Sequence, residues 1–154
     1  MEINIRTNIS KEFNNIEVMI NAPEKTEQVV EIENALLNLN FGNISEIIGI
    51  QGNSLYILNV SDIIKFYSDE KKNYCKTSEG NFVIKEKLYF LEDNLPKDKF
   101  IRISNSVIVN IEKVKCFDTS ILGSIIIKFK DNTQEYVSKR RVSSVMKFLK
   151  DRRS

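Results

Sequence analysis

Three short polar segments carry the side chains that are best suited to bind a ligand. The segments are Lys71-Lys72-Asn73, Ser104-Asn105-Ser106 and Ser138-Lys139-Arg140-Arg141. Lysine and arginine pair with anions, and the arginine fork also reaches two acceptors at once. Asparagine donates and accepts in one plane, and serine does both through one hydroxyl. This chemistry suits phosphate groups and the hydrogen-bonding edges of bases.

The third segment is informative because of its position. It lies between a predicted strand and the predicted terminal helix, so three adjacent cations stand at a helix N-terminus. Cations are unfavourable at that end of the helix dipole, which indicates that another interaction, such as one with an anion, holds them there. Simpler alternatives stay open for each segment: an ordinary polar loop for the first, a turn cap for the second and a solvated charge run for the third.

The second segment interrupts two apolar runs. Residues 100–103 lead into it and residues 107–109 lead out, and both runs are rich in residues that suit strands. Three consecutive hydroxyl and amide side chains would each need a partner in a core, so we expect them at the rim of a sheet. Arg102 lies between two isoleucines and is expected to point to the opposite face of its strand.

The pattern from residue 44 onward is mostly β. Gly52-Asn53 and Glu79-Gly80-Asn81 lie between apolar runs and are typical of hairpin turns, while residues 68–73 indicate a polar loop. A short helix is expected over residues 85–94, and an amphipathic helix over residues 142–149. Further strands are expected at residues 46–51, 54–58, 63–67, 74–77, 82–84, 114–117, 125–129 and 133–137.

Residues 1–43 are interpreted as a separate extension. Two alternating stretches, at residues 3–5 and 16–20, predict strands, and apolar residues at three- and four-residue steps predict a helix from near Pro23 to near Gly42. Such a ββα unit is too small to fold well alone, so its apolar stripe is expected to pack on another domain or on a second copy. The main domain is expected at residues 44–150.

The charge is distributed unevenly along the chain. The net charge is only +2, yet residues 138–154 hold seven basic residues and one acid, and residues 1–41 hold seven acids against three basic residues. An acidic front and a basic tail indicate that only part of the chain meets a polyanion.

Composition argues against several classes of function. The 154 residues include no histidine, two cysteines and five glycines, and no glycine-rich phosphate loop or paired-carboxylate motif occurs. We therefore expect no enzymatic activity, no metal site and no cofactor. No apolar run approaches the length of a membrane span, and the N-terminus lacks the pattern of a signal peptide, so a cytoplasmic location is expected.

One run of residues resembles the hallmark of the LytTR family of DNA-binding domains: Phe100, Arg102, Ile103, Ser106, Ile108, Val109 and Asn110. Gly123, residues 136–140 and the predicted helix with Leu88, Leu91 and Glu92 extend the resemblance over most of residues 44–149. It implies an α+β fold that is mainly β, with stacked small β-sheets, a short helix and here a C-terminal helix. Family members insert loops, and not a recognition helix, into successive major grooves of DNA.

The resemblance also implies which residues meet DNA. By position, the first loop would hold Lys71, Lys72 and Asn73, the second Ser104 and Asn105, and the third Ser138, Lys139 and Arg140. Two positions depart from the usual family residues. Lys139 replaces an arginine and cannot fork onto guanine, and Ser104 replaces a histidine.

The full prediction is a bacterial, stand-alone transcription regulator that binds double-stranded DNA and has no receiver domain. Its DNA-contacting residues are expected to be Lys71, Lys72, Asn73, Arg102, Ser104, Asn105, Ser138, Lys139, Arg140 and Arg141. A homodimer formed through the N-terminal extension is expected, and a membrane protein is a candidate modulator. The alternative is a protein-interaction or ligand-sensing β domain with a solvated basic tail. RNA binding is disfavoured because Tyr74, at an edge, is the one aromatic residue near the three segments.

Overall fold

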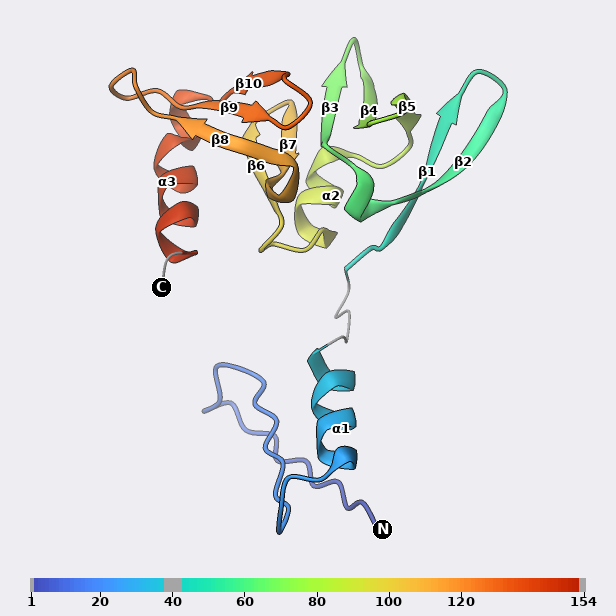
Figure 1. Ribbon diagram of the computed structural model, residues 1–154, viewed down its shortest axis with the longest axis vertical. Helices are drawn as coiled ribbons and strands as arrows, with labels where there is room; N and C mark the ends of the chain where they lie inside the picture. Colours follow the sequence, from blue (N-terminus) through green and yellow to red (C-terminus); the bar gives the residue numbers. More distant parts are fainter. Residues whose placement is uncertain (1, 38–42, 153–154) are drawn as a thin grey trace. The chain divides into compact units, whose positions relative to one another are not determined.

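The computed structural model describes residues 2–37 and 43–152. The chain divides into two compact units, residues 1–39 and residues 40–154. The larger unit contains all the described strands and two of the described α-helices (Figure 1). None of the described helices is long and apolar enough to cross a membrane.

Strands dominate the larger unit. The strands are β1 Glu46–Gln51, β2 Ser54–Asn59, β3 Lys65–Asp69, β4 Lys72–Thr77, β5 Gly80–Ile84, β6 Phe100–Ser104, β7 Val107–Asn110, β8 Val114–Asp118, β9 Ile126–Phe129 and β10 Gln134–Tyr136. The α-helices are α1 Glu27–Leu37, α2 Leu88–Asn94 and α3 Val142–Asp151. The prediction of a mainly β fold with a short helix and a C-terminal helix is therefore confirmed.

The strands form two antiparallel sheets. The seven-stranded sheet has the order β2-β1-β5-β4-β3-β7-β6, and the three-stranded sheet has the order β10-β9-β8. Strands that are consecutive in the chain supply most of the neighbours, as hairpins require. β1 joins β5 through a single residue pair, Ile50 with Val83, so the first hairpin meets the rest of the large sheet at one point of the ladder.

Two-residue turns close the β1–β2 and β3–β4 hairpins. Gly52-Asn53 connects β1 to β2 as predicted, and the φ of Gly52, 58°, favours glycine. The polar loop predicted at residues 68–73 is shorter than expected. Asp69 pairs with Lys72 across the ladder, so the strands extend further and only two residues form the turn. Ladder pairing satisfies backbone groups that a longer loop would leave to water, which explains the difference.

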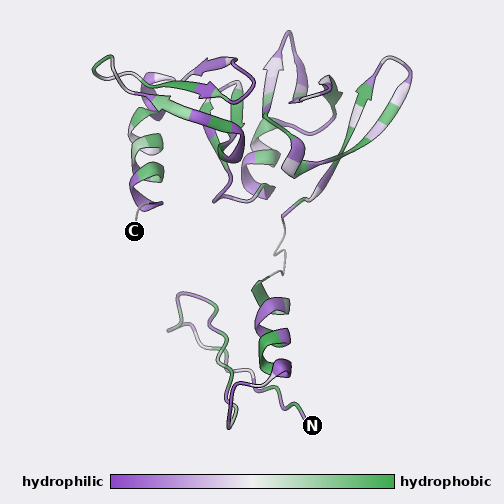
Figure 2. Ribbon diagram, viewed as in Figure 1, coloured by the Kyte–Doolittle hydropathy of each residue, from purple (hydrophilic) through white to green (hydrophobic). Residues whose placement is uncertain are grey.

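The large sheet has a hydrophobic core on each face. Leu91 of α2 packs in one core with Ile108 of β7, while Val109 of β7 packs in the other with Ile127 of β9 and Val145 of α3. Successive side chains of a strand alternate between faces, so β7 begins with three apolar residues. α3 begins with a hydrophobic residue, Val142, and its last two residues, Lys150 and Asp151, are hydrophilic (Figure 2).

Asn110 is the polar residue of β7, and it is buried. Its Nδ2 donates to the carbonyl of Ile63 at 2.8 Å, and its Oδ1 accepts from the backbone N–H of Glu112 at 3.0 Å. Both ends of the side-chain amide are therefore satisfied. Asn110 fixes the residues before β3 to the end of β7 and to the short 3₁₀ turn that follows.

In the N-terminal unit, α1 begins later than the sequence predicts, at Glu27 and not near Pro23. Thr26 caps the helix, because its Oγ1 accepts a hydrogen bond from the backbone N–H of Val29 at 3.4 Å. The helix end expected near Gly42 lies outside the described residues. In the larger unit α2 also starts late, at Leu88 instead of residue 85.

The prediction of two strands in the N-terminal extension, as part of a ββα unit, is wrong. Residues 2–26 contain no strand, so neither residues 3–5 nor residues 16–20 form one. An alternating sequence forms a strand only where a neighbouring strand supplies hydrogen bonds, and the described part of this unit provides none. The prediction considered only the alternation of apolar and polar residues and not whether a neighbouring strand was present.

Candidate nucleic-acid interface

Two backbone hydrogen bonds bring the three predicted contact segments together. The N–H of Ser68 in β3 donates to the carbonyl of Ser106 at 2.9 Å, which sets the β3–β4 tip beside the β6–β7 tip. The N–H of Ser138 donates to the carbonyl of Ile103 at 2.9 Å, which sets the segment before α3 beside β6. The three segments therefore lie toward one edge of the larger unit, the upper edge in Figure 1.

The β3–β4 tip is a strained turn. Glu70 and Lys71 have φ values of 47° and 69°, a region that side-chain-bearing residues rarely adopt. Lys71 and Lys72 are exposed. Asn73 is half-buried, and its Nδ2 donates to the carbonyl of Glu86 at 3.1 Å, just ahead of α2. Asn73 therefore anchors the tip, and the hydrophilic turn extends from the sheet (Figure 2).

Arg102 supports the β6–β7 tip through its backbone. Its Nε donates to the carbonyl of Ser104 at 3.1 Å, and its Nη2 donates to the carbonyl of Asn105 at 2.7 Å. Ser104 Oγ also accepts from the backbone N–H of Ser106 at 3.2 Å. These bonds use the backbone of the turn. The exposed side-chain amide of Asn105 has no hydrogen-bonding partner among the described residues, so it is available to a ligand.

Glu92 of α2 links the second and third segments. Its Oε2 accepts from Nη1 of Arg102 at 2.7 Å, and its Oε1 lies 3.7 Å from Nη1 of Arg141. The side chain of Arg102 is 16% exposed and that of Glu92 is 37% exposed, so solvent screens the pair only in part. All three nitrogens of the Arg102 guanidinium are engaged within the protein. Arg102 therefore supports the tip, with one N–H of each nitrogen bound within the protein.

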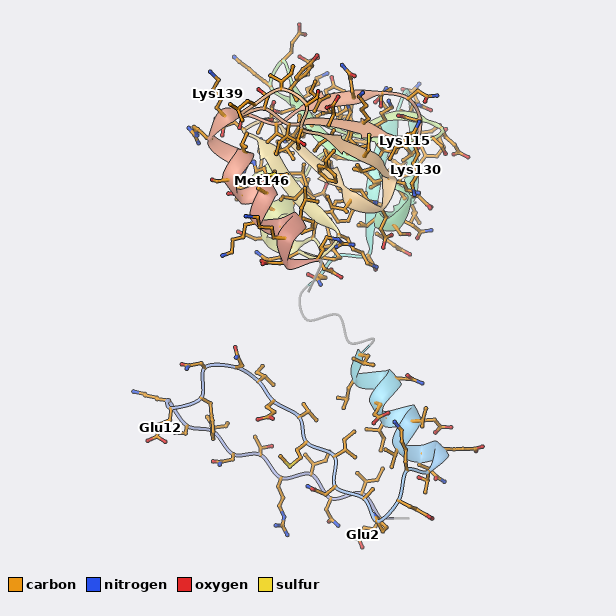
Figure 3. All side chains as sticks on the ribbon, turned by 60° about the vertical axis from the view of Figure 1, so that its left-hand side comes forward. Glu2, Glu12, Lys115, Lys130, Lys139 and Met146 are labelled. Atoms are coloured by element: carbon orange, nitrogen blue, oxygen red, sulfur yellow. The ribbon has the colours of Figure 1, made fainter. Side chains whose placement is uncertain are left out.

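The third segment leaves two cations free. Residues Lys139–Arg141 form a 3₁₀ turn that leads directly into α3. Lys139 and Arg140 are exposed and make no ion pair within the described chain, and the first turn of α3 carries no acid. Figure 3 shows Lys139 at the beginning of α3 and Met146 further along the helix. The positive charge predicted for this position is therefore not neutralised locally.

A shallow hollow of about 340 Å³ lies between the first two tips and the start of α2. Four predicted site residues line it: Lys71, Asn73, Arg102 and Asn105. The other six lining residues were not predicted as site residues: Ser68, Asp69, Glu70, Lys87, Leu88 and Tyr89. The apolar stripe of a short helix marks its buried side and gives no sign of which exposed residues face a neighbouring turn.

The predicted residues share one edge but differ in availability. The exposed ones are Lys71, Lys72, Asn105, Lys139 and Arg140. The half-buried ones are Asn73, Arg102, Ser104, Ser138 and Arg141. Across residues 2–37 and 43–152, no group of three or more cysteine, aspartate or glutamate residues is placed to hold a metal ion.

Free cations and an amide at the turns of a mainly β unit are groups of the kind with which DNA-binding domains contact phosphates and bases. The LytTr DNA-binding domain family matches residues 53–150. An HTH-type transcriptional regulator of Staphylococcus aureus strain NCTC 8325 is 33% identical over 149 residues, which are 97% of this chain and 98% of the relative. Its counterpart in bovine strain RF122 is 32% identical over 152 residues, with the same coverage. The chain belongs to the LytTr DNA-binding domain family, as the hallmark run predicts.

The fold is similar to that of a solved structure, the LytTr DNA-binding domain of a response regulator from Bacillus cereus. The TM-score is 0.67 at 24% identity, covering 70% of this chain and 98% of the other. The names of the Staphylococcus relatives refer to a helix-turn-helix. In the described part of this chain, five strands separate α2 from α3, and the two helices form no such motif.

Proposed function

We propose that this protein is a transcriptional regulator that binds duplex DNA sequence-specifically through the β3–β4 tip, the β6–β7 tip and the segment before α3. The supporting observation is that Lys71, Asn105 and Arg140 are exposed along one edge of a rigid β framework. A hairpin tip fits a major groove, which is about 12 Å wide. Separate tips along one edge reach successive grooves on one side of the duplex.

The ten predicted residues divide into two roles in this proposal. Lys71, Lys72, Lys139 and Arg140 contact phosphates or guanine, and Asn105 contacts a base edge such as that of adenine. Ser104 and Ser138 supply shorter polar contacts beside them. Asn73, Arg102 and Arg141 hold the tips in place through the hydrogen bonds and ion pairs described above. For Arg102 this replaces the direct DNA contact expected from the sequence.

The proposal is tested by titrating fluorescently labelled genomic duplexes with the full chain at several salt concentrations. Four cations on phosphates predict that log K falls with log salt at a slope of about −3.6, at about −0.9 for each phosphate. The affinity is also expected to depend on sequence. Binding that is weak, independent of sequence and flat with salt would favour the protein-interaction or ligand-sensing alternative.

Arg140→Ala is expected to weaken operator binding by about 1–3 kcal/mol, with an unchanged far-ultraviolet circular dichroism spectrum. The matched control is Lys115→Ala, which removes an exposed cation from β8 on the other sheet (Figure 3). Equal affinities for both variants and the unaltered chain would remove the third segment from the interface.

A homodimer formed through the N-terminal unit belongs to the same proposal. None of the residues of α1 is buried: Val29, Ile32 and Leu36 of its apolar stripe are half-buried, and Val30 and Leu37 beside the stripe are 40% and 82% exposed. A second copy would cover this stripe, and paired half-sites are common among DNA readers. A cytoplasmic location and modulation by a membrane protein complete the proposal. Sedimentation with and without DNA tests the dimer, and a monomer in both conditions would refute it.

A further inference from the structure

One acid lies among the candidate DNA contacts. Glu70 occupies the first position of the β3–β4 turn, is exposed, and lines the hollow together with Lys71, Lys87 and Asn105. A carboxylate on a surface that meets phosphates lowers affinity, because like charges repel. Its presence at this position calls for a favourable contact that offsets the repulsion.

The two acids that line the hollow have different surroundings. Asp69 ends β3 directly opposite Lys72 of β4, so its charge faces an opposite charge across the ladder. Glu70 lies beyond the last residue pair of that ladder and forms no ion pair within the described chain. The Glu70 carboxylate is therefore available at the tip, whereas Asp69 has a lysine directly across the ladder.

The turn itself does not favour glutamate at this position. The φ of Glu70 is 47°, and that of Lys71 is 69°, values at which asparagine, aspartate or glycine is less strained. A strained residue at a ligand-facing turn is commonly retained for function. The side chain of Glu70 is therefore better explained by what it contacts than by the turn that it forms.

We propose that Glu70 reads one base of the operator by accepting a hydrogen bond from an exocyclic amino group, N4 of cytosine or N6 of adenine, in the major groove. This inference rests on the DNA-binding function proposed above. Guanine and thymine present the O6 and O4 oxygens instead, and a carboxylate that faces such an acceptor is repelled. Glu70 thus rejects keto bases at one position and weakens binding to unrelated DNA.

The neighbouring cations make this role compatible with affinity. Lys71 and Lys87 line the same hollow, are exposed, and form no ion pair within the described chain. Their attraction to phosphates offsets the repulsion from Glu70 on any sequence. The contact with an amino group is added only on the correct sequence, so the carboxylate contributes discrimination and not overall affinity.

The test is selection from a randomised duplex library with the full chain and with Glu70→Gln. Glutamine has nearly the same shape but both donates and accepts, so it tolerates amino and keto bases. We expect the unaltered chain to select cytosine or adenine at one position, and E70Q to discriminate there about tenfold less. Affinity for unrelated duplex is expected to rise about threefold, as for removal of one charge about 7 Å from a phosphate in water.

The matched control is Glu79→Gln in the β4–β5 turn, at the other end of β4. The Glu79 side chain is exposed, and its backbone N–H donates to Thr77 Oγ1 within that turn. Glu79→Gln therefore makes the same change from glutamate to glutamine at a residue that does not line the hollow. We expect E79Q to select the same bases as the unaltered chain and to keep its affinity for unrelated duplex.

The outcomes separate this inference from the proposed function. If the unaltered chain selects no sequence, the proposed function fails. If it selects a sequence and E70Q selects the same bases with equal discrimination, Glu70 reads no base and the inference is overturned. An equal loss of discrimination in E79Q also overturns it, because the effect would then come from net charge alone.

Discussion

Replacement of Glu92 by alanine tests how the second and third contact segments are held together. The variant removes the carboxylate that accepts from Arg102 at 2.7 Å and lies 3.7 Å from Arg141. A hydrogen bond to a charged group contributes about 1.5–3 kcal/mol, and a fully exposed ion pair about 0.2–1 kcal/mol. Because the Glu92 side chain is 37% exposed, we expect a loss of about 1–2 kcal/mol in the free energy of unfolding.

The direction of the change in DNA affinity in Glu92→Ala distinguishes a charge effect from a positioning effect. Removal of a negative charge about 10 Å from a phosphate would by itself strengthen binding about twofold in water. The structure predicts the opposite, because Arg102 would lose one of the contacts that hold the carbonyls of the β6–β7 turn and with them Asn105. We expect operator affinity to fall about tenfold, the lower part of the range for a displaced base contact.

The assays are urea denaturation followed by far-ultraviolet circular dichroism, since the chain has no tryptophan, and anisotropy of a labelled duplex. Asp93→Ala is the control, because it removes the adjacent acid of α2, whose side chain is exposed. Tighter DNA binding by both variants, to the same extent, would mean that Glu92 acts only through its charge. The positioning role assigned to it would then be wrong.

Two further predictions concern the core beneath the site. Asn110→Ala leaves two backbone groups without their side-chain partner and is expected to lower the free energy of unfolding by about 2–4 kcal/mol in urea. Burial, with a contribution from the charge of Glu86, raises the pKa of Cys75 to about 12, so a thiol reagent at pH 8 should label exposed Cys116 and not Cys75 until urea is added. Because the folded state holds the Cys75 proton more tightly, this thiol's contribution to stability is present below about pH 9 and is lost as pH rises through about 12. Rapid labelling of both thiols in the folded protein would contradict the burial of Cys75.

Local sequence signals predicted most of the larger unit because its hairpins depend on residues that are close together in the sequence. Gly52-Asn53 predicts a turn through its backbone preferences, and alternating apolar residues predict the flanking strands. The same alternation failed in the N-terminal extension, since residues 2–26 have no strand beside them. Alternation records which side chains are apolar, and it does not record whether a partner exists.

The candidate site was predictable in its segments and less so in its roles. The three segments are recognisable from residue type, and the hallmark run implied that they act together. The engagement of Arg102 with Glu92 joins residues of different elements, so neither residue signals it locally. Lys87 and Tyr89 line the hollow only because α2 packs beside the β3–β4 tip, which the periodicity of a short helix does not encode.

In the proposed interface, the two-residue turns at Glu70-Lys71 and Asn105-Ser106 are distinct from the residues that keep the protein folded. The apolar side chains that form the two cores belong to the strands and helices, and none of these four residues contributes to either core. Exchange of one dipeptide for another would therefore alter the recognised sequence without repacking the interior. Related proteins on the same scaffold could diverge in their targets through a handful of tip substitutions, each acquired at little risk to the rest of the molecule.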